Sequence, residues 1–388
     1  MRALTFSVHA TDPASRARRG TIVTGHGPIE TPAFMAVGTR ATVTGLTPHE
    51  LESLGVQVVL GNTYHLLLRP GPELFRRVGG IHKYMGWKGP ILTDSGGYQI
   101  FSLPNSRTVS ERGARFKSYV DEQMTMLSPE RSIEMQTALG SDIMMVLDVC
   151  IDSTSDEAAT RAAMERTHRW ALRSLAARTN ASQALFAIVQ GGVVPELRRQ
   201  SASFLTEHPF DGFAIGGLAV GDTRAQREEM THFSAELLPA DRPRYLMGVG
   251  TPPDLLQAIL AGVDMFDCII PTQLASQGTA FTSTGRVRLT RAGNKQADVP
   301  LDVACPCSTC TTFSRSYLNH LFKCGEPLGE RLVASHNIFY YHSLMASARA
   351  AIEAGTYERF AKAQLEAIDH HEHSGKRFDD ATKSKEAE

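Results

Sequence analysis

The sequence lacks the long apolar segments that mark membrane and exported proteins. No apolar run in its 388 residues approaches the roughly 20 residues needed to span a bilayer. The N-terminal stretch MRALTFSVHATDPASRARRG also has no long apolar core and does not read as a signal peptide. These absences favour a cytoplasmic protein with no membrane association.

The chain also has almost no net charge, at −1 with 40 basic and 41 acidic residues. Bulk charge therefore gives no sign of a nucleic-acid binder, and any RNA-binding surface must be a local patch. The composition, 42% hydrophobic and 21% charged, predicts a sizeable core rather than wholesale disorder. The length suits an α/β barrel with insertions.

Phosphate-cradling motifs are missing, and the sequence has no internal repeat. What recurs instead is an apolar run followed at once by small or polar residues. The eight runs cover residues 34–38, 56–62, 90–97, 142–148, 185–192, 212–217, 244–250 and 265–270. Runs this apolar are typical of strands buried on both faces, as in a parallel sheet.

Signals for helices lie between these runs. The segment TPHE at 47–50 is a capping box with an early proline, and SP at 128–129 and TP at 251–252 repeat the same start. Residues 156–178 contain no glycine or proline and predict a long helix. The alternation predicts an α/β fold, a (β/α)₈ TIM barrel. An open doubly wound sheet is the alternative, less favoured because no Gly-x-Gly-x-x-Gly follows the early strands.

Segments outside the alternation of predicted strands and helices define the expected domains. Residues 1–33 are expected to form an extended N-terminal flap, and residues 34–271 the barrel core, with an insertion at 104–130. Residues 272–365, which carry four of the six cysteines of the chain, are expected to form a zinc-binding subdomain with closing helices. The charged stretch 366–388 is expected to be a disordered tail.

Four of the six cysteines lie within one short stretch, unlike a disulfide framework. Cys305, Cys307 and Cys310 give three thiols in six residues, and His336 lies downstream. Three thiolates and one imidazole make a closed tetrahedral set that suits a structural Zn²⁺. Other residues of the region remain alternative ligands: His320, His342 and Cys324.

Aspartates follow three of the predicted strands, at Asp94, Asp148 and Asp267. A single one could be a helix cap or an ion-pair partner, but three at one barrel mouth favour chemistry, because paired carboxylates can divide the roles of nucleophile and general acid/base. Asp264 and Asp267 lie three residues apart and point to opposite faces of their strand. Periodicity leaves open which of the two faces the pocket.

Five collinear motifs stand out: TDSGGYQIFS at 93–102, VQGG at 189–192, GGLAVG at 216–221, YLMGVGT at 245–251 and DMFDC at 264–268. With the cysteine triplet and SHN at 335–337, they resemble the queuine tRNA-ribosyltransferases, or tRNA-guanine transglycosylases, of the bacterial type. The similarity runs from about residue 5 to 360. It implies a (β/α)₈ barrel, a zinc subdomain and no organic cofactor.

Carried over position by position, the resemblance implies roles for individual residues. Asp267 is similar to the nucleophile of the family, and Asp94 to its general acid/base, which also contacts the base. The other matching positions bind the base: Ser95, Tyr98 by stacking, Asp148, Gln190 and the N–H of Gly217 on the purine edge, and Met247 as the lower wall.

The implied reaction exchanges guanine at the anticodon wobble position of tRNA for a deazaguanine base. A carboxylate attacks the anomeric carbon and holds the ribose covalently, so the energy of the glycosidic bond is kept and no nucleoside triphosphate is needed. Two inversions give retention. The target base must leave the stack, which suits a nucleotide in the anticodon loop.

The chain departs from the family pattern after its last barrel strand. Gln273 and Ser276 stand where many members carry arginines that would contact the anticodon loop. We expect Gln273 and nearby basic residues to contact the tRNA instead, with a solvated basic loop as the alternative. The basic residues are Arg286, Arg288, Arg291 and Lys295.

The identity of the incoming base depends on three positions. Asp222 replaces a glutamate common in bacterial members and is one methylene shorter, which would change any role in sensing the base substituent. Val220 and Cys150 match the bacterial type, which takes the prequeuosine base, 7-aminomethyl-7-deazaguanine. We favour this base, with queuine as the alternative.

Expected partners beyond the tRNA and the base include a second copy of the chain. Phe313, Tyr317 and His320 resemble a homodimer contact of the family, with internal packing of the aromatic rings as the alternative. A zinc-dependent barrel hydrolase is disfavoured because catalytic zinc rarely has three thiolate ligands. A non-catalytic tRNA-binding subunit is disfavoured because the chain keeps all three aspartates.

Overall fold

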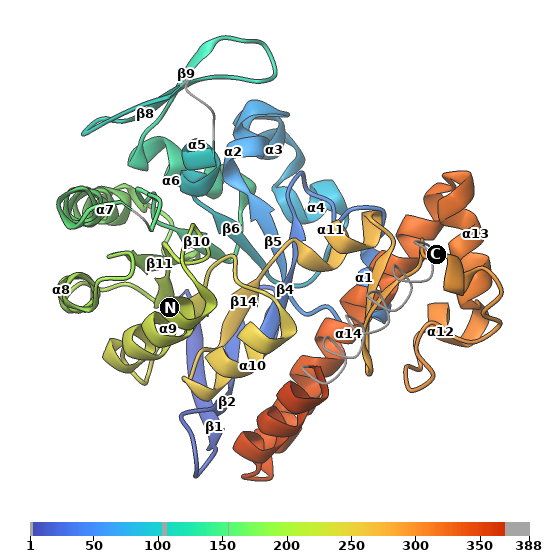
Figure 1. Ribbon diagram of the computed structural model, residues 1–388. Coiled ribbons are helices and arrows are strands. Elements are labelled where there is room, and N and C mark those ends of the chain that lie inside the picture. The colour runs from blue at the N-terminus through green and yellow to red at the C-terminus, as the bar shows by residue number, and fades with distance from the viewer. Residues whose placement is uncertain (1–2, 103–106, 154, 369–388) are drawn as a thin grey trace.

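The computed structural model describes residues 3–102, 107–153 and 155–368, and its centre is a closed barrel of eight parallel strands (Figure 1). In pairing order the strands are β4 (Ala33–Gly38), β5 (Val59–Asn62), β6 (Ile91–Asp94), β10 (Ile143–Met145), β11 (Ala184–Val189), β12 (Gly212–Ile215), β13 (Arg244–Leu246) and β14 (Met265–Asp267), which pairs with β4. Each strand falls on a predicted apolar run. The prediction of a TIM barrel is confirmed, and the open-sheet alternative is wrong.

The barrel core explains why these runs are so apolar. Every residue of β11 is buried, because one face of the strand meets the barrel interior and the other meets helices. Helices ring the barrel (Figure 1). They are α1 (Pro48–Ser53), α2 (Thr63–Leu68), α3 (Pro72–Val78), α4 (Ile81–Met85), α5 (Gly97–Ser102), α6 (Pro129–Leu139), α7 (Glu157–Ala177), α8 (Pro195–Thr206), α9 (Arg224–Leu237) and α10 (Pro252–Leu260).

The predicted helix starts are confirmed by their caps. Thr47 and Glu50 form the capping box of α1, Ser128 caps α6, and Thr251 caps α10. The long helix predicted over 156–178 is α7, whose N-cap is Asp156. These caps satisfy backbone N–H groups that a helix leaves unpaired at its start.

In addition to a two-stranded sheet in the chain after β14, two three-stranded antiparallel sheets lie outside the barrel. The first precedes it and consists of β1 (Thr5–Thr11), β2 (Arg18–Thr24) and β3 (Gly27–Thr31). The second lies between α5 and α6 and consists of β7 (Arg107–Ser110), β8 (Gly113–Lys117) and β9 (Met124–Leu127). Figure 1 shows them at opposite ends of the molecule, with β8 and β9 at the top and β1 and β2 at the bottom.

The chain after β14 forms a smaller unit against the barrel. It comprises α11 (Ile270–Ser276), β15 (Thr279–Thr282), β16 (Gly285–Arg288), η1 (Ala292–Asn294), α12 (Ser308–Thr312), α13 (Arg315–Cys324) and α14 (Pro327–Glu353). It has its own apolar cluster, which includes Leu289, Leu301 and Leu318. The helix α14 links this unit to the barrel, because Tyr341 on α14 donates a hydrogen bond to the carbonyl oxygen of Gly250 (2.6 Å).

The chain's last described residues, 357–368, are helical. This helix includes residues 366–368 of the predicted disordered tail, and residues 369–388 of that tail lie outside the described part of the chain. Among the described residues, no helix is both long enough and apolar enough to cross a bilayer.

Candidate active site at the barrel mouth

A cavity of about 420 Å³ opens at the carboxyl ends of the barrel strands. Asp94 ends β6, Asp148 follows β10 and Asp267 ends β14, and all three line this cavity. The structure therefore brings together the three aspartates that the sequence singled out. Among the described lining residues there is no lysine or arginine, so no adjacent cation neutralises these carboxylates.

Asp94 is held by neutral donors from the neighbouring strand. Its Oδ2 accepts a hydrogen bond from the Asn62 side-chain amide (2.7 Å), and its Oδ1 accepts one from the backbone N–H of Thr63 (3.0 Å). Burial, together with the nearby charges of Asp267 and Asp148, raises the pKa of Asp94 to about 7, against the lowering effect of the Thr63 bond. A carboxyl group with such a pKa can both give and take a proton near neutral pH.

Asp267 is held through one of its two oxygens. Its Oδ1 accepts hydrogen bonds from the Tyr245 hydroxyl (2.6 Å) and from the backbone N–H of Gly248 (2.7 Å). Within the described residues, no hydrogen bond reaches Oδ2. Burial raises the pKa of Asp267, while these two donors oppose the rise. The arrangement orients the carboxylate and leaves one oxygen available to a reacting carbon.

Asp148 is the most buried of the three, with 8% of its surface exposed. Its Oδ2 accepts a hydrogen bond from the Gln190 side-chain amide (2.7 Å). Burial raises the pKa of Asp148 to about 6, although the bonds from Gln190 and Ser95 lower it. Asp148 and Gln190 therefore form one hydrogen-bonded pair, in a position to read polar groups of a ligand.

Two glycines make room for this pair. A Cβ on Gly97 would lie 2.3 Å from Oδ1 of Asp148, and a Cβ on Gly217 would lie 2.2 Å from Oε1 of Gln190. Gly217 also has a φ of 65°, in the left-handed region that favours glycine. At Gly97 the backbone lies close to the Asp148 carboxylate, and at Gly217 it lies close to the Gln190 amide. Only a residue without a side chain fits at either position.

The remaining candidate base-binding residues also gather at the cavity. Ser95, Tyr98, Gly217 and Met247 line it, and Tyr98 is 55% exposed, so one face of its ring is open to a ligand. Gln190 does not line the cavity itself and acts on it through Asp148 and Gly217.

Asp264, by contrast, lies away from the cavity and is fully buried. Its two oxygens pair with the Arg18 guanidinium, at 2.9 and 2.6 Å, and Oδ2 also accepts the backbone N–H of Arg244 (2.7 Å). The ambiguity between the two aspartates of this strand is thus settled by tertiary contacts: Asp267 faces the pocket and Asp264 ties the N-terminal sheet to the barrel.

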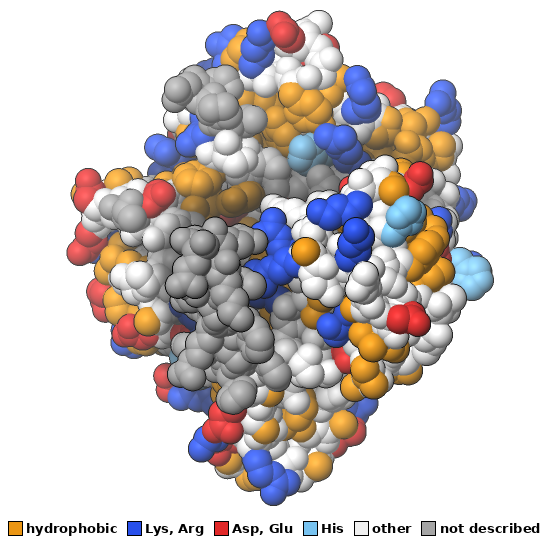
Figure 2. Space-filling view, turned by 45° about the vertical axis from the view of Figure 1, so that its right-hand side comes forward, with side chains coloured by type: hydrophobic (Ala, Val, Ile, Leu, Met, Phe, Trp, Pro, Cys, Tyr) orange, Lys and Arg blue, Asp and Glu red, His pale blue; other side chains and the backbone are white. Residues whose placement is uncertain are grey.

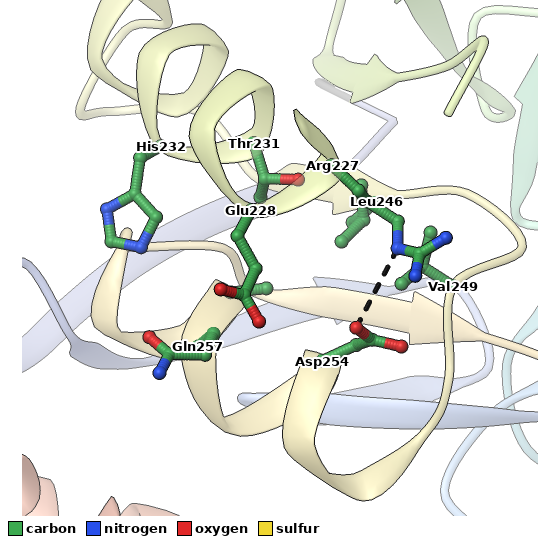
Figure 3. A pocket seen from close by; sticks show the side chains of 9 residues that line it. Arg227, Glu228, Thr231, His232, Leu246, Val249, Asp254 and Gln257 are labelled. Atoms are coloured by element: carbon green, nitrogen blue, oxygen red, sulfur yellow. Dashed lines mark ion pairs between the residues drawn. The ribbon is translucent and has the colours of Figure 1, made fainter. Parts of the chain in front are cut away.

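A second pocket, between α9 and α10, is far smaller, at about 10 Å³ (Figure 3). It has room for one water molecule at most. Figure 3 shows Arg227 reaching toward Asp254, to which it is ion-paired (3.7 Å). Arg227 also approaches Asp222 (3.5 Å), and Asp222 accepts a hydrogen bond from the N–H of Val220, which lines the large cavity. This region supports the mouth and is too small to bind a base.

Four potential metal ligands converge in the C-terminal unit, with their ligand atoms all within 4.8 Å of one another: Cys305, Cys307, Cys310 and His336. The sulfur atoms lie 3.7, 3.4 and 3.2 Å from Nδ1 of His336. A tetrahedral zinc site with ordinary bond lengths would separate these atoms by about 3.6 Å. The other ring nitrogen, Nε2, hydrogen bonds to the carbonyl oxygen of Phe281 (2.6 Å), which fixes the ring.

The alternative ligands are not part of this cluster. Cys324 contacts His320 on its own helix, and His342 is buried elsewhere on α14. The predicted set of three cysteines and His336 can therefore hold a metal ion.

Comparison with known proteins covers nearly the whole chain. A family model described as queuine tRNA-ribosyltransferase matches residues 12–370. The queuine tRNA-ribosyltransferase of Solidesulfovibrio magneticus is 48% identical over 366 residues, which are 94% of this chain and 97% of the relative. That of Thermotoga neapolitana is 49% identical over 347 residues, 89% of this chain and 94% of the relative. The chain belongs to the queuine tRNA-ribosyltransferase family.

Membership of the queuine tRNA-ribosyltransferase family confirms the predicted enzyme class, a pentosyltransferase of the tRNA-guanine transglycosylase type. The hydrolase alternative is not supported, since the cysteine-rich site lies in the C-terminal unit and none of its ligands lines the mouth cavity.

The residues expected to contact tRNA lie outside the cavity. All five are exposed: Gln273 on α11, Arg286 and Arg288 on β16, and Arg291 and Lys295. Figure 2, in which the side carrying α12–α14 is turned forward, shows Lys and Arg side chains across the middle of this face, where few acidic side chains lie. A chain with almost no net charge thus carries a locally basic surface.

The expected dimer residues lie on or beside α13. Phe313 and Tyr317 stack on each other, with ring centroids 5.4 Å apart, and Tyr317 and His320 are exposed. The two rings thus pack internally and still leave an exposed edge.

Sequence reasoning missed the side chains that hold the catalytic candidates. Asn62 and Tyr245 contact Asp94 and Asp267 directly. Asn62 ends an apolar run just as Asp94 does, and that position was a usable signal. Tyr245 lies within an apolar run, where an aromatic residue indicates core packing rather than a hydrogen bond to a carboxylate.

Proposed function

We propose that this protein exchanges guanine at the wobble position of tRNA for the prequeuosine base, 7-aminomethyl-7-deazaguanine, through a covalent bond between Asp267 and the ribose. The observation that carries the proposal is the cavity with three carboxylates and no cation among its described lining residues. Within this cavity, two donors orient Asp267 through Oδ1. Its Oδ2 accepts no hydrogen bond from the described residues.

In the first half-reaction, Oδ2 of Asp267 forms a bond to the anomeric carbon as the bond from that carbon to the guanine nitrogen breaks. Asp94 gives its proton to the departing guanine. The pKa of Asp94, raised to about 7, keeps a protonated fraction available near neutral pH. The ribose remains bound to the protein, so water does not capture it.

In the second half-reaction, the incoming base loses a proton to the Asp94 carboxylate. Its nitrogen then forms the new bond to the anomeric carbon as the bond to Asp267 breaks. Each displacement inverts the carbon, and two inversions restore the original configuration. Protons and electrons balance without a nucleoside triphosphate or an organic cofactor.

Base recognition in this proposal uses groups around Asp148. The Asp148 carboxylate accepts hydrogen bonds from N–H groups of a guanine-like edge, and the N–H of Gly217 binds its oxygen side. Gln190 contributes to base binding by holding the Asp148 carboxylate in place. Tyr98 stacks on the base, an interaction worth about 1–3 kcal/mol. Ser95 and Met247 complete the pocket walls.

The incoming base is the least constrained part of the proposal. Val220 and Cys150 line the cavity beside Asp148, as expected for a bacterial-type pocket for the prequeuosine base. Queuine, which carries a larger substituent, is the alternative. Asp222, which holds the N–H of Val220, is one methylene shorter than the glutamate common in bacterial members and is expected to influence this choice.

The experiment that tests the function is exchange of labelled guanine into tRNA that bears a wobble guanine. Incorporation by the purified protein, competed by the prequeuosine base at lower concentration than by queuine, would support the proposal. Competition by queuine alone would reassign the incoming base. No incorporation by the folded wild type would overturn it and leave the role of a non-catalytic subunit.

The covalent step has a separate readout. Denaturing gels of protein incubated with tRNA in the absence of a competing base should show an RNA–protein adduct in the wild type and none in Asp267→Asn. Exchange without any adduct, even after rapid acid quenching, would argue for a dissociative reaction without the bond to Asp267.

We further propose that the three cysteines and His336 hold one structural Zn²⁺, because four protein ligands leave no open position. Removing it should unfold the C-terminal unit rather than only lower activity. Cys307→Ser should lose one equivalent of zinc and melt at lower temperature, whereas Cys324→Ser, outside the cluster, should change neither.

The remaining assignments complete the proposal. We propose that the chain divides into residues 1–33, 34–271, 272–365 and 366–388, and that the protein meets its tRNA in the cytoplasm.

We propose that five exposed residues contact the anticodon loop: Gln273, Arg286, Arg288, Arg291 and Lys295. The exposed edge of Phe313, Tyr317 and His320 is proposed to join two subunits. A steeper salt dependence of tRNA binding in the wild type than in Arg288→Ala would support the RNA contacts.

A further inference from the structure

A second group of metal-ligating side chains lies at the end of the barrel opposite the mouth. It comprises His26, in the turn between β2 and β3, His82 on α4, and Asp142, which directly precedes β10. One ligand atom from each residue lies within 4.8 Å of the other two. Three segments far apart in the sequence thus converge on one point, separate from the cysteine cluster and from the cavity.

The geometry centres on the buried carboxylate. Nδ1 of His26 lies 2.8 Å from Oδ1 of Asp142, and Nε2 of His82 lies 3.3 Å from Oδ2. Asp142 is 5% exposed, and its Oδ2 also accepts the backbone N–H of Ile91 (2.9 Å). The two imidazole rings stack, with centroids 3.6 Å apart and planes 14° apart.

One ring nitrogen in this group makes no hydrogen bond. Nε2 of His82 is shielded from solvent and lies 3.3 Å from Oδ2 of Asp142, but the pair does not meet hydrogen-bond geometry. Buried polar atoms are satisfied in the great majority of cases, by protein, water or an ion. The atom lies beside the carboxylate that His26 also contacts, so a single ion there would satisfy it.

We propose that His26, His82 and Asp142 bind a divalent first-row transition metal ion, with water completing the coordination. Two imidazoles and a carboxylate suit zinc, cobalt or nickel rather than magnesium or calcium. His82 is mostly buried, with 11% of its side chain exposed, and supplies a fixed ligand. His26 is 41% exposed and lies in a turn, which leaves an entry path and freedom to move.

Binding requires one rearrangement. A metal ion lies in the plane of each imidazole that coordinates it, and the two stacked planes cannot share one ion. The His26 ring therefore turns away from the stack when the ion binds, while His82 and Asp142 stay in place. The ion would fasten the β2–β3 turn to the start of β10, and binding only to the folded state would stabilise it.

The test uses the full-length protein with its cysteine site already loaded with zinc. Added Co²⁺ should bind as one further equivalent per chain, measured by elemental analysis after desalting. Its near-ultraviolet absorption should lack the sulfur-to-cobalt charge-transfer bands that a thiolate site gives. Saturating Co²⁺ should also raise Tm by a few degrees.

Matched variants assign the ion to this group. His82→Ala and His26→Ala should each lose the extra equivalent and the shift in Tm, whereas His9→Ala, an exposed histidine of the same sheet, should keep both. His26→Ala keeps the test valid if His82→Ala fails to fold, because His26 is on the surface. Absence of a further equivalent in the wild type, or equal binding in His9→Ala and His26→Ala, would overturn the proposal.

Discussion

The two ends of the barrel use aspartate in opposite ways, and β14 shows both uses. Asp264 stands just before this strand and pairs with Arg18 through both oxygens. Asp267 ends the strand and has only the Tyr245 hydroxyl and the Gly248 N–H as donors. Three residues therefore separate an ion-paired carboxylate from the proposed nucleophile, and the difference lies in the groups that surround them.

The contrast extends around the barrel. Asp142, Asp211 and Asp264 directly precede β10, β12 and β14, and each accepts a backbone N–H of a neighbouring strand, at 2.9, 2.9 and 2.7 Å. Burial raises the pKa of Asp94, Asp148 and Asp267 at the mouth and also that of Asp264 at the opposite end. The difference is that the Arg18 guanidinium opposes the rise at Asp264, whereas no lysine or arginine is among the described residues that line the mouth. The carboxylates at the N-terminal end of the barrel hold the backbone of neighbouring strands in place, whereas we propose that those at the mouth transfer a proton, bind the base and attack the ribose.

After the loss of the proposed nucleophile Asp267, the largest predicted effect at the mouth concerns Asp94. Asp94→Asn keeps the side-chain volume but cannot donate or accept the reaction's proton, so the exchange rate should fall about 10²- to 10⁴-fold. Single-turnover kinetics with labelled guanine would measure this. In the wild type, the pH profile should show a group titrating near pH 7, in line with the pKa of about 7 for Asp94. A wild-type inflection that persists in the variant would assign it to another group.

At the opposite end, Asp264→Ala should act on stability. It leaves the buried Arg18 guanidinium without its partner, which costs about 3–5 kcal/mol of unfolding free energy. Urea denaturation followed by circular dichroism would measure the loss. Asp241→Ala is the matched control, because Asp241 is 74% exposed and pairs with Arg242 on the surface. Equal losses in both variants would remove the distinction between the two ends.

Tyr245→Phe should sharpen the comparison within β14. It removes one of the two donors to Oδ1 of Asp267, and a hydrogen bond to a charged group is worth about 1.5–3 kcal/mol. The exchange rate should therefore fall about 10- to 100-fold, with the KM for tRNA nearly unchanged. A change in KM alone would indicate that Tyr245 positions the tRNA rather than the nucleophile.

The last predicted effect concerns the pH dependence of stability at the mouth. Because the folded-state pKa of Asp94, about 7, lies above its ordinary value of 3.8, ionisation is disfavoured in the folded state. Stability from this group is therefore present below about pH 4 and is lost as pH rises through 7. Asp94→Asn should remove that loss, so the stability gained by the variant over the wild type should be greater at pH 8 than at pH 4. No difference between the two pH values would show that Asp94 ionises freely in the folded protein.

Much of the fold follows from local sequence, because a strand buried on both faces must be apolar along its length. All eight barrel strands were predicted on that basis, and the caps of α1, α6 and α10 were predicted from a serine or threonine followed by proline. Aspartates at strand ends also pointed to the mouth, since parallel strands bring their carboxyl ends together.

What the sequence left open depends on partners that are distant in the chain. Arg18 lies 246 residues before Asp264, so periodicity within β14 could not assign that carboxylate to an ion pair. The choice of His336 over His342 depends on the rotation of α14 toward the cysteines, which only tertiary packing sets. Asn62 was recognisable as a polar residue at a strand end, but its hydrogen bond to Asp94 depends on the register between β5 and β6.

The most direct test of the account is a paired measurement on Asp267→Asn and Asp264→Asn, with guanine exchange and unfolding free energy determined for each. We predict that Asp267→Asn loses at least about 10³-fold in exchange while remaining as stable as the wild type or more so. Asp264→Asn should lose stability yet, below its melting temperature, retain most of its exchange activity. Normal exchange by a folded Asp267→Asn variant would contradict the assignment of the nucleophile and with it the division of roles between the two ends of the barrel.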